Sequence, residues 1–206
     1  MFAEEEAALL LDSGSDDVEA RIERRIAGEP LETVLGWVDF GGRRLVVRPG
    51  VFVPRRRTEL LARTAAAHCR PDSVLLELCC GVGPVAASVD AHEVHLGDLD
   101  PVALSCARLN VPHGHPHLSD LYAALPADLE RRIDVVAANA PYVPTDRIAL
   151  MPPEARDHEQ RMALDGGVDG VDLHRRIAAG APVWLAPGGV LMIETSPLQA
   201  PLTAQA

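Results

Sequence analysis

Apolar and polar residues alternate along this chain in two different periods, one helical and one extended. From Ala3 to Ala27 apolar residues recur at helical spacing, and Ser13 to Asp16 supply cap residues between two short helices. Trp37 to Phe40 and Arg44 to Val47 alternate apolar and polar residues around Gly41-Gly42, a dipeptide suited to the positive φ angles of a tight turn. The pattern therefore predicts a short helical segment followed by a β-hairpin.

Beyond Pro54 the helical and extended patterns take turns along the chain. The predicted helices lie at Thr58 to His68, around Val85, at Pro101 to Asn110 and at Gly170 to Ala179; the predicted strands lie at Ser73 to Leu78, Glu93 to Leu96, near His117, at Ile133 to Asn139 and at Val190 to Glu194. This order is typical of βαβ units, so we expect an α/β fold with a mostly parallel sheet and a ligand site at the carboxyl ends of its strands. We divide the chain into a helical segment, residues 1–36, a hairpin linker, residues 37–53, and a main domain, residues 54–206.

The composition is that of a globular protein, and it narrows the classes of partner. The 206 residues suit one domain with a small appendage, and 48% of them are hydrophobic. The formal net charge is −11 and every basic residue is arginine, which argues against a broad phosphate-binding surface and makes nucleic acid a disfavoured partner. No apolar run approaches the roughly 20 residues of a membrane span, so we expect a cytoplasmic protein without a membrane partner.

Three groups of chemically active side chains have plain structural interpretations. The cysteines lack the paired spacing of a zinc site and a secretory context, so we interpret them, including vicinal Cys79-Cys80, as small buried residues. His113, His115 and His117 alternate as metal ligands could, but no carboxylate accompanies them, and we expect no metal site. The charged run from Glu154 to Glu159 is interpreted as a solvated loop or a lid over the substrate.

Acidic residues and glycines mark the ends of the first three strands of the main domain. Glu77 precedes a turn, Cys79 to Gly83, whose glycines let the backbone approach a ligand closely. Asp98, followed by Leu99, ends the next strand, where a carboxylate can accept both ribose hydroxyls of a nucleoside. Asp120 closes the third strand, where its carboxylate can accept a hydrogen bond from an adenine amine. These residues together predict a nucleoside-containing ligand.

The fourth strand ends in Asn139-Ala140-Pro141-Tyr142. The amide oxygen of Asn139, the main-chain carbonyl of Ala140 and the aromatic face of Tyr142 can together hold a planar –NH2 group by its two hydrogens. The alternative is an Asx-type turn followed by proline, without a ligand.

From Arg25 onward the chain resembles the HemK-like protein-(glutamine-N5) methyltransferases, the release factor glutamine methyltransferases, with the family's motifs in the same order. The matching segments are Gly28 to Leu31 with Gly36, Val53 to Leu61 (similar to P-R-P-E-T-E), Glu77 to Gly83 (D-x-G-x-G-x-G), Asp98 to Leu104 (D-I-S-x-x-A-L), Asn139 to Tyr142 (N-P-P-Y), Ala163 to Gly170 (A-L-x-G-G-x-D-G) and Pro187 to Glu194. The resemblance implies a class I S-adenosylmethionine-dependent methyltransferase of Rossmann-like fold, whose main domain binds the cofactor and carries the active site.

The resemblance also assigns roles to residues. The implied cofactor-binding residues, for S-adenosylmethionine and its product S-adenosylhomocysteine, are Glu77, Cys79, Gly81, Gly83, Asp98, Leu99, Asp120 and Asn139. The implied catalytic residues are Asn139, Ala140, Pro141 and Tyr142. The acceptor is a glutamine side chain of a protein, such as a peptide chain release factor. Orienting the glutamine amide toward the methyl donor needs neither a metal nor a general base.

The sequence departs from the family at four motif positions. Cys79 stands for the first glycine of the cofactor turn and Glu77 for an aspartate, Arg57 replaces an acidic residue, and Ala140 replaces the first proline of N-P-P-Y. Ala140 keeps its carbonyl and is held extended by Pro141. We interpret the site as altered but competent.

Compared with the family, the chain is reduced at both ends. The family's strand order is 3-2-1-4-5-7-6, so we expect the last strand pair to be absent and Val190 to Glu194 to form a sheet edge. An apolar edge is a template for pairing, so self-association through this fifth strand is expected unless Thr195 to Ala206 folds over it, which Pro197 and Pro201 disfavour.

Two other functions remain open from the sequence. The same asparagine turn suits the exocyclic amine of adenine, with Tyr142 stacking on a flipped base, as in nucleic-acid N6-methyltransferases, although the acidic net charge counts against this. The altered motifs are also compatible with a catalytically silent S-adenosylmethionine-binding protein.

Overall fold

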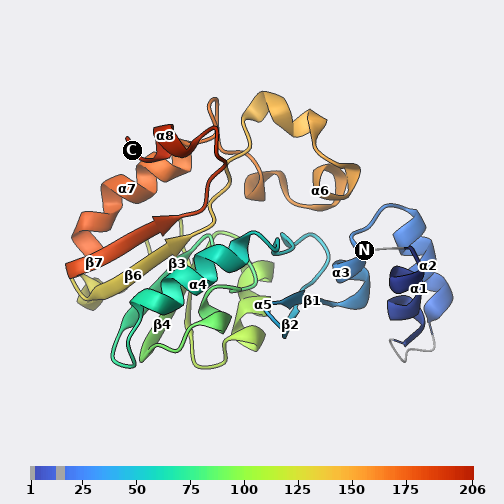
Figure 1. Ribbon diagram of the computed structural model, residues 1–206, viewed down its shortest axis with the longest axis horizontal. Coiled ribbons are helices and arrows are strands. Elements are labelled where there is room, and N and C mark those ends of the chain that lie inside the picture. The colour runs from blue at the N-terminus through green and yellow to red at the C-terminus, as the bar shows by residue number, and fades with distance from the viewer. Residues whose placement is uncertain (1–2, 13–16) are drawn as a thin grey trace.

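The computed structural model describes residues 3–12 and 17–206, and a five-stranded parallel sheet lies at its centre (Figure 1). The strands are β3 (Val74–Leu78), β4 (Glu93–Asp98), β5 (His115–Leu118), β6 (Ile133–Ala138) and β7 (Leu185–Ile193). Their order across the sheet is β5-β4-β3-β6-β7, and every pair is parallel. The predicted sheet is therefore confirmed, in the order 3-2-1-4-5 that the resemblance implied.

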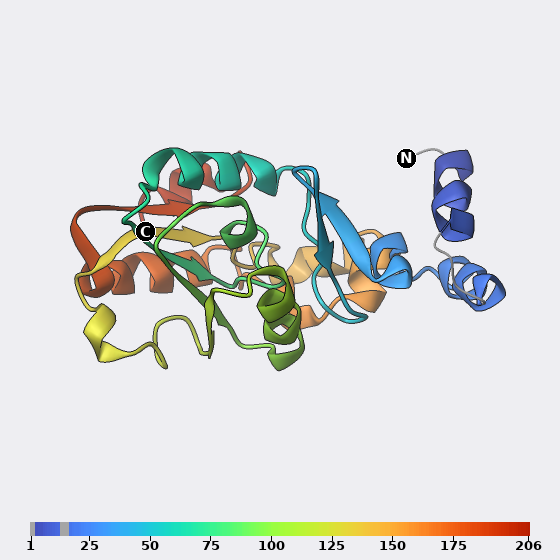
Figure 2. The ribbon, with the colours of Figure 1, turned by 90° about the horizontal axis from the view of Figure 1, so that it is seen from below.

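Helices cover both faces of the sheet, as Figures 1 and 2 show. α4 (Thr58–His68) and α5 (Pro101–Asn110) pack on one face and α7 (Asp172–Trp184) on the other. Neighbouring residues of β3 point to opposite faces, so Leu75 belongs to the core under α4 and α5 whereas Leu76 belongs to the core under α7. Because both faces are buried, the central strands β3 and β6 are mostly apolar, with Glu77 and Asp134 as their charged residues.

The N-terminal part forms a separate small layer at one end of the molecule. It contains α1 (Ala3–Asp12), α2 (Val18–Ile26), α3 (Leu31–Leu35) and the antiparallel hairpin of β1 (Trp37–Phe40) and β2 (Arg43–Val46). Gly41 and Gly42 take positive φ angles of 58° and 78°, which confirms the predicted tight turn. The cap residues proposed at Ser13 to Asp16 lie outside the described residues. In both views the hairpin lies between these helices and the sheet.

Two helix predictions were wrong in length or type. The helix expected around Val85 is a single 3₁₀ turn, η1 (Ala86–Ser88), because the backbone is already extended at Val89 and the chain re-enters the sheet at Glu93. The helix predicted to end at Ala179 continues to Trp184. Gly180 is tolerated inside it because a Cβ there would lie 2.6 Å from the Tyr122 ring, so the glycine lets that ring pack against α7.

Several short elements were not predicted from the pattern. They are α3 (Leu31–Leu35), η2 (Ala127–Leu129), η3 (Thr145–Leu150), α6 (Pro153–His158), η4 (Arg161–Ala163) and α8 (Ala200–Thr203). In the part of the chain that the structure describes, no helix is long and apolar enough to cross a bilayer.

A histidine cluster joins the edge strand β5 to β4. His95 Nδ1 lies 2.9 Å from His117 Nε2, and His95 Nε2 lies 2.9 Å from a carboxylate oxygen of Glu93. His115 stacks on His95 with 5.1 Å between ring centroids. Burial lowers the pKa of His95 and of His117 below their ordinary value, although Glu93 opposes this at His95 and Arg132 adds to it. Within the described ranges no group of three or more His, Cys, Asp or Glu side chains is placed to hold a metal ion.

We expect this cluster to make the stability of the fold depend on pH. The folded-state pKa values of His95 and His117 lie below the ordinary 6.5. Their contribution to the free energy of unfolding is therefore fully present above about pH 6.5 and is lost as the pH falls from there through the folded-state pKa values. Urea midpoints should therefore fall between roughly pH 7.5 and pH 5.5. The fall should be smaller in His117→Gln, and an equal fall in both proteins would contradict the assignment.

Candidate functional site

A pocket opens at the carboxyl ends of β3, β4, β5 and β6, where the sequence predicted the ligand site. Its void, open mouth included, is about 900 Å³, which is the size of a small-molecule site. The lining residues are Gly50, Phe52, Pro54, Glu77, Cys79, Cys80, Gly81, Val82, Pro84, Gly97, Asp98, Leu99, Asp100, Ala103, Ser119, Asp120, Leu121, Asn139, Pro141, Gln160, Met162, Ala163 and Leu173.

The glycine turn after β3 is shaped by left-handed backbone. Cys79 has a φ of 51° and Gly81 a φ of 53°, and open space lies where a Cβ of Gly81 would be. Cys79 thus holds, as a non-glycine residue, a conformation that favours glycine. Gly83 also has a positive φ, but a Cβ there would meet Val111 at 3.3 Å, so Gly83 serves packing against α5 and does not line the pocket.

Glu77, in β3, holds the residues that follow the glycine turn. Its buried carboxylate accepts hydrogen bonds from the main-chain N–H groups of Val85 (3.2 Å) and Ala86 (2.7 Å). Burial raises the pKa of Glu77 to about 8, although the two N–H groups favour its charged form. Glu77 therefore ties η1 to the end of β3 while it lines the pocket.

The Asp98 side chain, at the end of β4, is fixed by two hydrogen bonds from the main chain. One carboxylate oxygen accepts from Gly81 N–H at 2.7 Å and the other from Asp100 N–H at 2.9 Å, which locks the side chain across the glycine turn. Each oxygen keeps a second lone pair for a ligand hydroxyl. Burial raises the pKa of Asp98. Leu99 lines the pocket beside it, and half of its side chain is exposed.

Asp120 lines the same pocket and forms an ion pair with Arg176. One of its carboxylate oxygens accepts a hydrogen bond from the Arg176 guanidinium of α7 at 2.8 Å. The ion pair connects the loop after β5 with α7 and leaves the second carboxylate oxygen for a ligand.

The Asn139 to Tyr142 turn, here called the substrate loop, contributes two of its four residues to the pocket lining, Asn139 and Pro141. The Asn139 side-chain nitrogen donates to Thr58 Oγ1 at 3.3 Å, which orients the amide oxygen. Ala140 is buried in the core on the α7 side. The Tyr142 ring lies outside the lining, between Arg57 (5.7 Å from guanidinium carbon to ring centroid) and His174.

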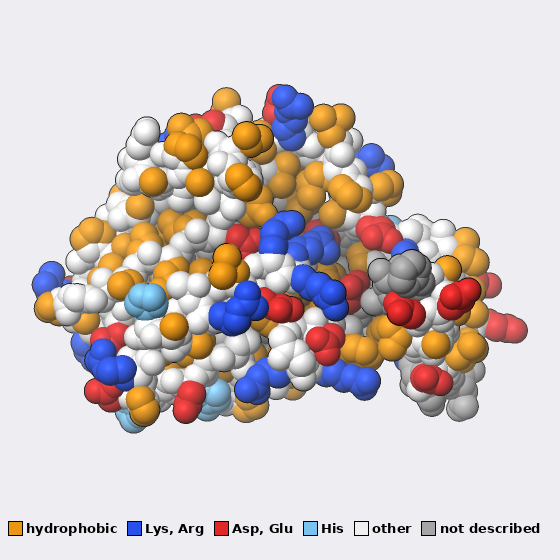
Figure 3. All heavy atoms as spheres, viewed as in Figure 1, with side chains coloured by type: hydrophobic (Ala, Val, Ile, Leu, Met, Phe, Trp, Pro, Cys, Tyr) orange, Lys and Arg blue, Asp and Glu red, His pale blue; other side chains and the backbone are white. Residues whose placement is uncertain are grey.

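The family departure at Arg57 is compensated within this protein. Arg57 Nε donates to Glu194, which follows β7, at 3.0 Å. Figure 3 shows arginine side chains gathered across the middle of this face, whereas acidic side chains predominate over the N-terminal helices. Arg57 thus links the start of α4 to the end of β7 beside Tyr142.

Glu159 is buried, which corrects the prediction of a solvated charged run from Glu154 to Glu159. One oxygen accepts from Val53 N–H at 3.1 Å and from the Arg55 guanidinium at 2.7 Å. The buried ion pair fixes the segment after α6 against the residues ahead of α4. Glu154 and Asp157 are exposed, as the prediction had it.

Pocket residues that the sequence analysis missed come from segments far from the strand ends. Phe52 lies on one wall, with the Arg55 guanidinium 5.0 Å from its ring centroid. Gln160 also lines the pocket, and its side-chain nitrogen donates to the Asp100 carboxylate at 3.0 Å. The sequence pattern gives little signal for this wall, because Gln160 lies among charged residues and follows no predicted strand.

The two thiols at the glycine turn are not activated. Burial raises the pKa of both Cys79 and Cys80, so both remain neutral at pH 7. This agrees with the interpretation of the vicinal pair as unreactive, but only Cys80 is buried as expected, because Cys79 is partly exposed and lines the pocket.

Comparison with solved structures supports the fold. The chain is similar to an M. jannaschii tRNA m1G37 methyltransferase, with 18% identity, a TM-score of 0.53, and coverage of 82% of this chain and 46% of that one. It is also similar to Methanocaldococcus jannaschii Trm5 in complex with adenosine, with 16% identity, a TM-score of 0.51, and coverage of 75% and 40%. At these identities the likeness concerns the fold alone, and the predicted class I methyltransferase fold is confirmed.

Sequence comparison is more specific, although no family model matches the chain. The release factor glutamine methyltransferase of Geobacter sulfurreducens is 34% identical over 178 residues, with 84% of this chain and 63% of the relative covered. That of Streptomyces coelicolor is 37% identical over 188 residues, with 86% and 66% covered, so the chain spans slightly less than two thirds of these two relatives. That of Deinococcus radiodurans is 37% identical over 210 residues, with 96% of this chain and 75% of the relative covered. At this identity and coverage, the chain belongs to the release factor glutamine methyltransferase family.

Proposed function

We propose that this protein transfers a methyl group from S-adenosylmethionine to the side-chain nitrogen of a glutamine in a protein, with a peptide chain release factor as the acceptor. The observation that carries the proposal is that one pocket is lined both by the nucleoside-type residues and by the substrate loop: Asp98 and Asp120 on one side, Asn139 and Pro141 on the other. The family membership supports the same reaction.

The residues present fit S-adenosylmethionine. Open space lies where a side chain at Gly81 would be, so a ligand can approach the glycine turn. Asp98 has lone pairs that would accept hydrogen bonds from the ribose hydroxyls, Leu99 and Leu121 would offer apolar contact to the adenine ring, and Asp120 would accept a hydrogen bond from its amine. When bound, the cofactor supplies a methyl group on an already activated sulfonium.

The chain's own residues then have to orient the acceptor. A glutamine amide is a poor nucleophile because its nitrogen lone pair is conjugated with the carbonyl. Asn139, oriented by Thr58, would accept one hydrogen of the acceptor –NH2, and the main-chain carbonyl of Ala140 would accept the other. Both interactions favour the positive charge that develops on nitrogen, and they direct the nitrogen toward the donor side of the pocket.

The direct test is incubation of the protein with isotope-labelled S-adenosylmethionine and a full-length release factor, or a peptide that contains Gly-Gly-Gln. Mass spectrometry should place one added methyl group on the glutamine, and a peptide with Gly-Gly-Glu should remain unlabelled. Donor binding without transfer to either acceptor would indicate a catalytically silent protein. Labelling of an adenine-containing oligonucleotide instead would indicate base methylation.

We further propose that the protein self-associates through β7. Within residues 3–12 and 17–206, this nine-residue strand pairs with β6 on one side only, so its other side carries main-chain groups that no described strand pairs with. Among the described residues, the hydrogen bonds that residues 195–206 make with the rest of the chain reach Tyr142, Asp169 and His174, and none pairs this segment with β7.

Sedimentation across the micromolar range should therefore detect a dimer. Because Glu194 N–H donates to Ala138 on β6, alternation along the strand turns the Leu191 N–H outward. Leu191→Pro removes that outward donor and keeps the ladder to β6, so it should shift the protein toward monomer. A wild-type monomer at all concentrations would rule the association out.

A further inference from the structure

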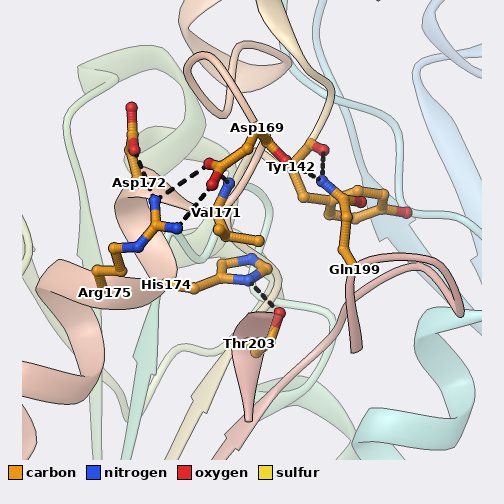
Figure 4. Close-up of polar contacts among 8 residues, drawn as sticks. All are labelled: Tyr142, Asp169, Val171, Asp172, His174, Arg175, Gln199 and Thr203. Atoms are coloured by element: carbon orange, nitrogen blue, oxygen red, sulfur yellow. Dashed lines mark hydrogen bonds and ion pairs between the residues drawn. The ribbon is translucent and has the colours of Figure 1, made fainter. Parts of the chain in front are cut away.

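The substrate loop is held from the C-terminal side by one side chain, Gln199 (Figure 4). The Gln199 side-chain nitrogen donates to the main-chain carbonyls of Tyr142, at 2.8 Å, and Asp169, at 3.0 Å. Its side-chain oxygen accepts from Ser196 Oγ at 2.6 Å. Gln199 is 8% exposed, so the amide is buried and both of its hydrogens are used.

Two glycines let the chain come close enough for these bonds. A Cβ at Gly170, whose φ is +77°, would lie 2.1 Å from the Gln199 side-chain nitrogen and 2.4 Å from the Tyr142 carbonyl oxygen. A Cβ at Gly166 would lie 2.7 Å from Tyr142 Cα and 2.8 Å from the Pro141 carbonyl oxygen. The turn of residues 166–170 therefore packs backbone against backbone on the substrate loop.

The main chain after the loop is fixed to the same turn. Val143 N–H donates to Leu164 O at 3.0 Å, and Gly166 N–H donates to Val143 O at 2.8 Å. Gln199 adds a second link between the same two segments, because one of its hydrogen bonds goes to Tyr142 in the loop and the other to Asp169 in the turn. It thus connects the loop to the turn across their contact.

The segment that carries Gln199 is itself anchored on α7. Thr203 Oγ1 donates to Thr195 Oγ1 at 3.1 Å and lies 2.9 Å from His174 Nδ1, so it accepts the hydrogen of that nitrogen. His174 is fully buried. Figure 4 shows His174, Thr203 and Gln199 along one side of the loop, with Arg175 pairing with Asp169 and Asp172 beside them.

We infer that Gln199 is a positioning residue for the acceptor amide. By fixing the carbonyl of Tyr142, it sets the path of the preceding loop, and so the direction of the Ala140 carbonyl and the Asn139 side chain that would hold the acceptor –NH2. The inference rests on the proposed function. A displacement of about 1 Å in such a site is enough to cost roughly a hundredfold in rate.

The test uses Gln199→Glu, which keeps the size of the side chain but, as a carboxylate, has no hydrogen to donate to the two carbonyls. For the Gly-Gly-Gln peptide we expect kcat to fall at least about tenfold near pH 8, with S-adenosylmethionine affinity within about twofold because Gln199 does not line the pocket. Protonation restores one donor, so the deficit should narrow as the pH approaches about 5.5. Gln205→Glu, exposed on the same segment, is the matched control.

A second readout separates this inference from the proposed function. Hydrogen exchange at the amides of Val143 and Gly166 should be faster in Gln199→Glu than in wild type or Gln205→Glu, whatever the acceptor. If Gln199→Glu does not fold, Gln199→Met, of similar length, carries the same comparison without the pH recovery. Unchanged exchange, or faster exchange with unchanged kcat, would overturn the inference. Absence of transfer by the wild-type protein would count against the proposed function instead, and the exchange comparison would still decide whether Gln199 holds the loop.

Discussion

Replacement of Asn139 by alanine is expected to lower kcat for the glutamine acceptor by roughly a hundredfold or more and to leave S-adenosylmethionine affinity nearly unchanged. Asn139 lines the pocket at the end of β6, and its side-chain nitrogen donates to Thr58, so its oxygen is the group that would contact the proposed acceptor. Single-turnover rates and donor titration calorimetry measure the two quantities separately. Retained turnover would remove Asn139 from the mechanism, and a large loss of donor affinity would make it a cofactor ligand.

Thr58→Val provides a graded comparison. Thr58 is fully buried at the start of α4, and valine keeps its shape while removing the oxygen that orients Asn139. The Asn139 amide would then be free to rotate, so kcat should fall by less than in Asn139→Ala. An effect as large as that of Asn139→Ala would point instead to a general disturbance of the pocket wall.

The elements that sequence reasoning predicted best are those whose ends are set locally. The helix Pro101–Asn110 was predicted with its observed bounds because Asp100 caps it, accepting from Val102 N–H at 2.8 Å, and Pro101 starts it. The strand ends carrying Glu77, Asp98 and Asn139 followed from the alternation of apolar runs, and the parallel sheet then brought all three side chains to one pocket.

Long-range pairing accounts for what the sequence pattern missed. Glu159 looked like part of a solvated run because its neighbours are charged, but it is buried by Arg55 and Val53, more than a hundred positions away. Arg57 replaces an acidic residue of the family motif, and the fold places Glu194 beside it as its ion-pair partner. A stretch of neighbouring residues cannot show the partners of Glu159 or Arg57, because these contacts exist only after the sheet has formed.

Asp98→Ala is expected to weaken S-adenosylhomocysteine binding by at least about 1.5–3 kcal/mol, or roughly 10- to 150-fold in Kd. The carboxylate sits across the glycine turn, where its two oxygens already accept from Gly81 and Asp100. Alanine therefore removes the proposed hydrogen-bond acceptors for the ribose. It also leaves the N–H groups of Gly81 and Asp100 without their partner, so the glycine turn is no longer held by this side chain. Calorimetry with the product avoids turnover during the measurement.

Asp120→Ala separates these two contributions. Asp120 lines the same pocket, but it accepts a hydrogen bond from Arg176 on α7 and not from the glycine turn, so its removal leaves the turn intact. If the ribose contact dominates, Asp98→Ala should weaken binding more than Asp120→Ala. Asp98→Asn refines the comparison, because its amide oxygen can still accept from one N–H group while the charge is lost. Equal affinities for wild type and Asp98→Ala would mean that the nucleoside does not lie across the end of β4, and the donor site would have to be reassigned.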